Sequence, residues 1–101
     1  MISETLARDE VIRTLRQLKP EFERRYGVSR IGVFGSVARN QARGDSDVDV
    51  VVELVDPDLF HLVHIKDSLE EHLGRPVDIV QFREKMNEYL KKHIQSEAIY
   101  A

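Results

Sequence analysis

The chain contains no cysteine. This absence excludes disulfides and thiolate metal sites, and it is in keeping with a reducing cytoplasm. No apolar run approaches the ~20 residues that a membrane-spanning helix needs. The first residues, MISETLARDEV, also lack the basic start and apolar stretch of a signal peptide. We therefore expect a cytoplasmic protein that does not contact a membrane.

Basic charge is not in excess either. The sequence has 15 Lys and Arg against 18 Asp and Glu, which gives a formal net charge of −3 at pH 7. A free-standing nucleic-acid binder usually carries a clear basic excess, so we do not expect direct binding to nucleic acid. The 101 residues, 42% of them apolar, predict a single domain over residues 1–101 with one modest core.

Helix and strand signals alternate along the chain. Residues 3–26 predict a helix because apolar residues recur there at spacings of three and four, and Pro20 predicts either a kink or the start of a second helix. Further helices are expected over residues 37–41, 57–73 and 84–96, and strands over residues 30–34, 47–54, 76–80 and 98–100. This alternation predicts an α/β (α+β) fold, a small sheet flanked by helices.

The helix expected over residues 57–73 carries further local signals. Asp56 is expected to cap it, with Pro57 in its first position. Its apolar stripe is expected to lie in the core and comprises Leu59, Leu62, Val63, Leu69 and Leu73.

A Gly-Ser pair follows the first expected strand. Gly35 would let the backbone approach a ligand closely, and Ser36 could offer its hydroxyl and its N–H to a phosphate at a helix start. Ser36 could equally cap a short helix, which is the commoner use of serine. Arg39, three residues further on, could meet the same phosphate or lie on the solvated surface. The Gly-Ser pair alone is a weak signal for a nucleotide site.

Two aspartates stand at the start of the next expected strand. Asp47 and Asp49 are two residues apart, so in a strand they project from the same face. Two such carboxylates suit a hard cation such as Mg²⁺, or a close pair of ions. The run Val50–Val52 predicts burial on both faces of this strand, which would hold the acidic pair rigidly.

A third aspartate, Asp78, lies between Val77 and Ile79 in a short strand that otherwise reads as core. An unpaired buried carboxylate is costly, so this residue calls for a partner or a function. If its strand lies beside the acidic strand, Asp78 completes a three-carboxylate cluster. The alternatives are a pairing with arginine or a position at a solvent-exposed edge. Together, the phosphate turn and the carboxylates predict metal-assisted transfer from a nucleoside triphosphate.

Gly35-Ser36, ten further residues and then Asp47-Val48-Asp49 resemble the signature of the nucleotidyltransferase superfamily, which has the polymerase-β-like fold. The fuller string IGVFGSVARNQARGDSDVDVVVEL, with PVDIV after it, is similar to the minimal nucleotidyltransferases, antitoxins encoded beside HEPN-domain toxins. The resemblance implies a mixed sheet and places Gly35 and Ser36 at the nucleotide phosphates. It also implies that Asp47 and Asp49 are Mg²⁺ ligands, with Asp78 as a ligand or general base.

The same resemblance implies an activity, the transfer of AMP from ATP to a tyrosine of a partner HEPN toxin, whose RNase action is thereby silenced. Two alternatives stay open. The chain could neutralise its partner by binding alone, or it could modify RNA or a small molecule. The three carboxylates favour catalysis over binding alone, because a pure binding protein has little use for them. The acidic net charge counts against RNA as the acceptor.

Overall fold

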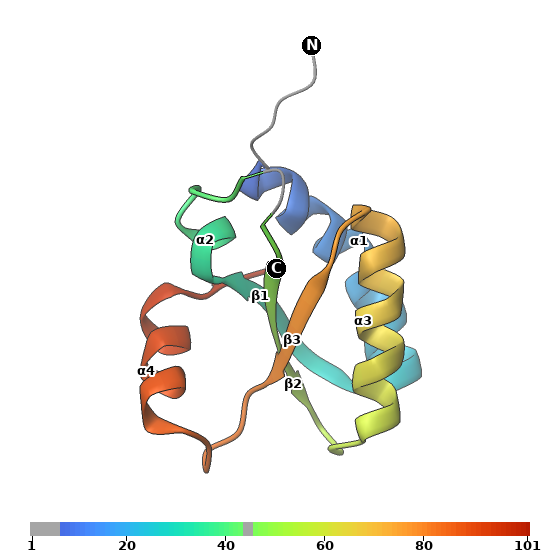
Figure 1. The fold of residues 1–101 in the computed structure, drawn as a ribbon. Helices are drawn as coiled ribbons and strands as arrows, with labels where there is room; N and C mark the ends of the chain where they lie inside the picture. Colours follow the sequence, from blue (N-terminus) through green and yellow to red (C-terminus); the bar gives the residue numbers. More distant parts are fainter. Residues whose placement is uncertain (1–6, 44–45) are drawn as a thin grey trace.

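The computed structural model describes residues 7–43 and 46–101. Within these residues four strands form one mixed sheet in the order β3-β2-β1-β4 (Figure 1). The strands are β1 (Val28–Phe34), β2 (Val48–Leu54), β3 (Val77–Gln81) and β4 (Ile99–Tyr100). β1 runs antiparallel to both β2 and β4, whereas β2 and β3 are parallel. The expected mixed α/β architecture is confirmed.

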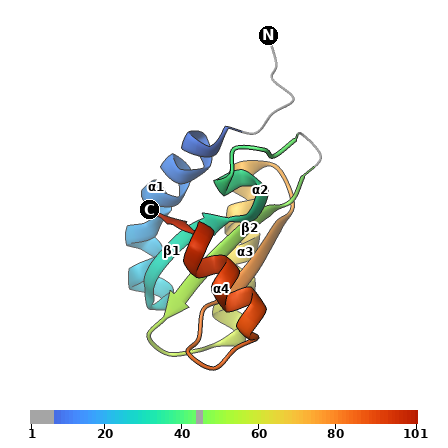
Figure 2. The ribbon, with the colours of Figure 1, turned by 90° about the vertical axis from the view of Figure 1, so that its left-hand side faces the viewer.

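Helices cover both faces of this sheet. α1 (Arg8–Tyr26) and α3 (Leu59–Leu73) pack on one face, and α4 (Glu88–Glu97) lies on the other, as Figures 1 and 2 show. The short α2 (Gly35–Ala38) follows directly after β1. None of the helices within the described ranges is both long and apolar enough to cross a bilayer.

The valine run of β2 is buried on both faces, as predicted. Val48, Val50 and Val52 belong to the main core, which β2 shares with α1 and α3. Val51 points the other way and joins Phe34 and Ile94 in a smaller cluster beneath α4. β2 is therefore fixed from two sides, and the acidic residues at its start are attached to a rigid element.

Helix boundaries differ from the sequence expectations at several points. α1 is one helix that runs through Pro20, and its expected start at residues 3–6 lies outside the described residues. α3 is capped by Asp58 and not by Asp56, since the Asp58 carboxylate accepts a hydrogen bond from the Phe60 N–H at 2.8 Å. α4 begins four residues later than expected, at Glu88, after an Asn87 cap.

The expected core stripe of α3 is only partly correct. Leu69 is buried, but Leu59 and Val63 are 73% and 48% exposed. The shift of the cap to Asp58 makes Leu59 the first residue of the helix. Leu59 and Val63, near the start of α3, therefore face solvent. Ile65 and Leu69, further along the helix, pack in the main core.

Candidate active site

The candidate site begins where β1 ends. Gly35 has φ +70°, a backbone conformation that side chains disfavour. A Cβ atom at this position would collide with the Oδ2 atom of Asp49 and would lie 3.1 Å from its Cγ. Position 35 thus requires glycine for two reasons: its positive φ angle, and the lack of space for a side chain beside Asp49. The Gly-Ser turn and the acidic strand are in direct contact.

Ser36 lies in α2, which begins two residues earlier than expected, at Gly35. Phe34 occupies the cap position, and no side chain caps this helix, so Ser36 does not have the capping role that was its alternative. Its side chain is half-buried, and its hydroxyl makes no hydrogen bond within residues 7–43 and 46–101. The first N–H groups of any helix also lack intrahelical partners. These donors can serve a ligand.

Asp49 and Asp78 occupy neighbouring positions in the sheet. In the parallel pairing of β2 and β3, Asp49 is opposite Asp78, and across β1 it is opposite Phe34. The expectation that the third acidic strand lies beside β2 is therefore confirmed. Of the alternatives for Asp78, the position at a solvent-exposed edge is the one observed, because β3 is an edge strand and the Asp78 side chain is exposed to solvent.

Asp47 lies one residue before the start of β2 and is exposed. The sequence expectation put it inside the strand, on the same face as Asp49, and this boundary is wrong by one residue. Asp47 is nevertheless close enough for its charge to act on Asp49. The strand holds Asp49 firmly, whereas Asp47 belongs to the segment that leads into it.

The pKa of the Asp49 carboxyl is raised above its ordinary value. Burial is the largest cause, and the negative charges of Asp78 and Asp47 add to it, while Arg39 and His93 act in the opposite direction. A half-buried carboxylate among like charges is stabilised by any cation that binds nearby. The local electrostatics therefore favour a bound metal ion.

Arg39 lies at the C-terminal end of α2 and is held from the opposite side by α4. Its Nη1 donates to both carboxylate oxygens of Glu97 at 3.0 Å, and its Nε donates to the Gln41 side chain at 3.2 Å. Glu97 also pairs with His93 Nε2 at 3.1 Å. This arrangement holds a guanidinium group near Asp49.

The donor set suits Mg²⁺. This ion prefers oxygen ligands and is commonly held by one or two carboxylates together with substrate phosphates. In the part of the chain that the structure describes, no three acidic or histidine side chains are gathered closely enough to hold an ion alone. The predicted three-carboxylate cluster is therefore not preformed. Asp49 and its neighbours fit an ion that is shared with a nucleotide.

The family model of the nucleotidyltransferase domain matches residues 15–101 of this chain. The chain belongs to this family. The nucleotidyltransferase is 35% identical to protein adenylyltransferase MntA of Thermococcus cleftensis over 96 residues, which cover 94% of this chain and 96% of the relative. It is 37% identical over 92 residues to a Methanocaldococcus jannaschii protein that is provisionally named a protein adenylyltransferase, covering 90% of this chain and 94% of that one.

Solved structures agree on the fold. A chain provisionally named a minimal nucleotidyltransferase superposes with a TM-score of 0.75 at 36% identity, covering 93% of this chain and 95% of that one. A complex of an MNT antitoxin with the tri-AMPylated HEPN toxin of Shewanella oneidensis gives a TM-score of 0.67 at 18% identity, covering 92% of this chain and 70% of that chain. At that identity, the second likeness establishes the fold alone.

Sequence reasoning missed Glu97 and His93. Both lie on α4, four residues apart, and the sequence places them far from the Gly-Ser turn. The only available signal was their helical spacing, which puts them on one face of α4. That spacing does not indicate which side chain the face would meet.

Proposed function

We propose that this nucleotidyltransferase transfers AMP from ATP to a tyrosine of a partner HEPN-domain toxin and so silences it. The observation that carries the proposal is the direct contact between the Gly35 turn and the Asp49 carboxylate, which joins a phosphate-binding turn to an acidic site. The adenylyltransferase names of the relatives and the tri-AMPylated toxin bound by the structural neighbour support the choice of reaction. The absence of cysteine supports the cytoplasm as its compartment.

Each residue of the candidate site would have a separate role in binding or catalysis. Gly35 gives the triphosphate access to the backbone, and Ser36 offers its hydroxyl and N–H to the phosphates. Arg39 adds a positive charge beside Asp49. Asp47 and Asp49 would hold Mg²⁺, one ion or two, and Asp78 would serve as a further ligand or as the general base. When bound, the metal supplies charge neutralisation for the phosphates and the leaving group.

The reaction itself is a displacement at the α-phosphorus. A tyrosine oxygen of the partner forms a bond to that phosphorus, the bond to the bridging oxygen breaks, and pyrophosphate leaves. The phenolic proton must pass to a base. Asp78 is the candidate because it is solvent-exposed and lies opposite Asp49 in the sheet, so it can release the proton to water.

The test is an intact-mass measurement of the cognate HEPN-domain protein after incubation with this chain, ATP and Mg²⁺. We expect mass gains in whole multiples of AMP. The variant Asp47→Asn/Asp49→Asn should lower the rate by about a hundredfold or more, since it removes charge from the site of phosphoryl transfer. Asp67→Asn, an exposed position on α3, is the matched control and should leave the rate unchanged.

Other outcomes would point elsewhere. A stable complex with no mass gain would indicate neutralisation by binding alone. Labelled AMP found on RNA and not on the protein would identify a nucleic-acid acceptor. Mass gains that persist in the double variant would contradict the role of the acidic pair.

A further inference from the structure

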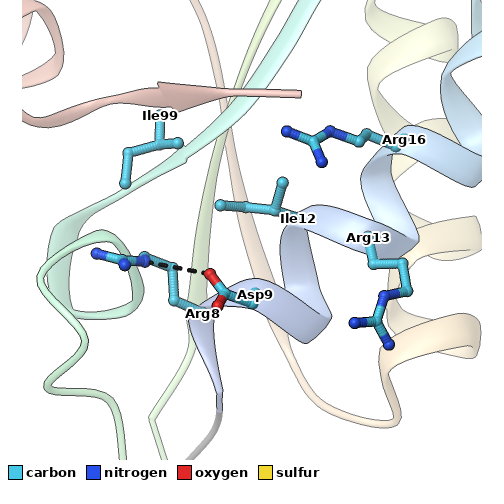
Figure 3. Close-up of a pocket in the computed structure, with 6 residues that line it drawn as sticks. All are labelled: Arg8, Asp9, Ile12, Arg13, Arg16 and Ile99. Atoms are coloured by element: carbon cyan, nitrogen blue, oxygen red, sulfur yellow. Dashed lines mark ion pairs between the residues drawn. The ribbon is translucent and has the colours of Figure 1, made fainter.

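A hollow lies outside the candidate active site. It has a volume of about 430 Å³ and opens between the first turns of α1 and β4 (Figure 3). Its lining residues are Arg8, Asp9, Ile12, Arg13, Arg16 and Ile99. Asp47, Asp49 and Asp78 of the candidate active site do not line it, and neither does the Gly-Ser turn. Its volume falls within the range of roughly 300–1,000 Å³ that is typical of small-molecule sites.

The positive charge of this hollow is only partly compensated. The Nε atom of Arg8 is 3.6 Å from the Asp9 carboxylate, and its Nη1 donates to the Ala38 carbonyl oxygen at 3.4 Å. Arg13 and Arg16 have no carboxylate partner at ion-pair distance among the residues that the structure describes. Among the described residues, two guanidinium groups at one hollow therefore have no ion-pair partner, in a chain whose net charge is negative.

Apolar side chains lie between these charges. Ile12, on α1, is 7% exposed and packs in the main core, and Ile99 packs against the same core from β4. In Figure 3, Ile99 faces Ile12 from across the hollow, and the Arg16 guanidinium group lies beside Ile12, whereas the Arg13 guanidinium group points away from both isoleucines. A ligand in this hollow would therefore cover the apolar surface of Ile12 and Ile99 beside Arg16, with Arg13 at its edge.

We propose that this hollow binds a small phosphorylated molecule of nucleotide size. Its phosphate groups accept hydrogen bonds from Arg13 and Arg16, and its flat or apolar part rests on Ile12 and Ile99. Arginine suits this role because its planar fork donates two parallel hydrogen bonds to a phosphate. Arg8 is already engaged with Asp9 and Ala38, so it contributes less.

The phosphates of RNA share the same ligand chemistry. The limited volume and the apolar floor favour a small molecule over a polymer, because a nucleic-acid strand needs an extended basic surface. The negative net charge of the chain points in the same direction. The test therefore compares small phosphates with a short oligonucleotide.

The experiment is a titration of the ¹⁵N-labelled chain, followed by NMR, with AMP, pyrophosphate and a ten-nucleotide RNA as probes. Mg²⁺ is omitted to weaken binding at the acidic site. We expect AMP to give saturable shifts of the Ile12 and Ile99 amides. Arg13→Gln/Arg16→Gln should weaken this binding by about tenfold or more, because two charge-assisted hydrogen bonds are lost.

Matched variants separate a site from general charge attraction. Arg24→Gln/Arg25→Gln removes the same charge from the last turn of α1, outside the hollow, and should change the dissociation constant by less than about twofold. Arg13→Lys/Arg16→Lys keeps the charge but removes the fork, and an intermediate weakening is expected. Arg13 and Arg16 are exposed, so their substitution leaves the core intact.

Three results would overturn the proposal. AMP shifts confined to the amides around Gly35 and Asp49 would place all binding at the acidic site. Equal weakening by the two glutamine pairs would show attraction to charge without a site. Saturable shifts with RNA but none with AMP or pyrophosphate would exclude a small-molecule ligand.

Discussion

At the scale of single residues, the candidate site depends on a contact between two distant parts of the sequence. Gly35 leaves the space that the Asp49 carboxylate occupies, so each residue restricts what the other position can hold. Arg39 and Glu97 form a comparable pair across α2 and α4. The positions of the Asp49 carboxylate and the Arg39 guanidinium group each depend on one residue that is distant in the sequence.

Glu97 provides a test at this scale. Glu97→Gln removes the charge that holds the Arg39 Nη1, so the guanidinium loses its fixed position near Asp49. We expect the KM for the nucleotide to rise by about three- to tenfold, with a smaller change in kcat. Steady-state kinetics over a range of ATP concentrations would measure both constants.

Another glutamate of α4 provides the control for Glu97→Gln. Glu88→Gln, in the exposed first turn of α4, should leave KM and kcat unchanged. Glu97→Asp keeps the charge and should restore part of the loss. A lower KM in Glu97→Gln would contradict the interpretation, because Glu97 would then compete with phosphate for Arg39.

At the scale of elements, Glu70 ties α3 to the start of β3. Its Oε2 accepts a hydrogen bond from the Val77 N–H at 2.8 Å and one from the Lys66 Nζ at 3.3 Å. These two contacts hold the pKa of the Glu70 carboxyl below its ordinary value of 4.5, the Val77 hydrogen bond being the larger cause. The strand that carries Asp78 therefore depends on a charged side chain of a helix.

This linkage predicts a dependence of stability on pH. A carboxyl whose pKa is lower in the folded state stabilises that state above its ordinary pKa. This stabilisation is lost as the pH falls through the lowered value. At pH 7, Glu70→Gln should therefore melt at a lower temperature than the wild type, and the difference should shrink as the pH falls below about 4.5.

Melting curves between pH 7 and pH 3 would measure this difference. Glu71→Gln, at the exposed neighbouring position, should follow the wild type throughout. A difference between Glu70→Gln and the wild type that stayed constant down to pH 3 would show that the ionised carboxylate is not the cause.

Elements also show what the sequence could and could not predict. The valine run of β2 predicts burial on both faces, and the structure confirms it, whereas the sequence leaves the pairing of β2 with β3 as a condition that only the structure settles. The α3 cap was placed wrongly because Asp56 and Asp58 both suit an N-cap, and only the path of the chain into the helix selects Asp58.

The candidate site divides in the same way. Gly35, Ser36 and the aspartates belong to local patterns that can be read directly from the sequence. The exposure of Asp78 depends on β3 being an edge strand, and the partnership of Arg39 with Glu97 depends on where α4 crosses the sheet. Both are properties of tertiary structure, and no local pattern contains them.

At the scale of the whole molecule, the two faces of the sheet are unequally packed. The face beneath α1 and α3 holds most of the buried residues, whereas the cluster beneath α4 has only three buried side chains, those of Phe34, Val51 and Ile94. The helix that carries Glu97 is therefore held by a small buried cluster and the partly buried side chains around it. We expect α4 to be sensitive to small changes in its packing.

Ile94→Ala tests how much the packing beneath α4 contributes to stability. It removes the only fully buried side chain that the described part of α4 contributes, so the free energy of unfolding should fall by about 2–5 kcal/mol. Chemical denaturation would measure the loss. Tyr89→Ala, on the same helix but 81% exposed, should change the free energy by no more than about 0.5 kcal/mol. Equal effects of the two substitutions would contradict the proposed packing.

The place of β4 beside β1 has a consequence for the order of folding during synthesis. Gly32 leaves room for the Ile99 carbonyl oxygen, and β4 follows all the other described elements along the chain. A ribosome therefore releases β1, α2 and β2 well before α4 and β4. Since β1 and β2 pair antiparallel and lie close in sequence, we expect the contact of Gly35 with Asp49 to form early. The nascent protein would thus have its acidic site before Glu97 arrives to hold Arg39.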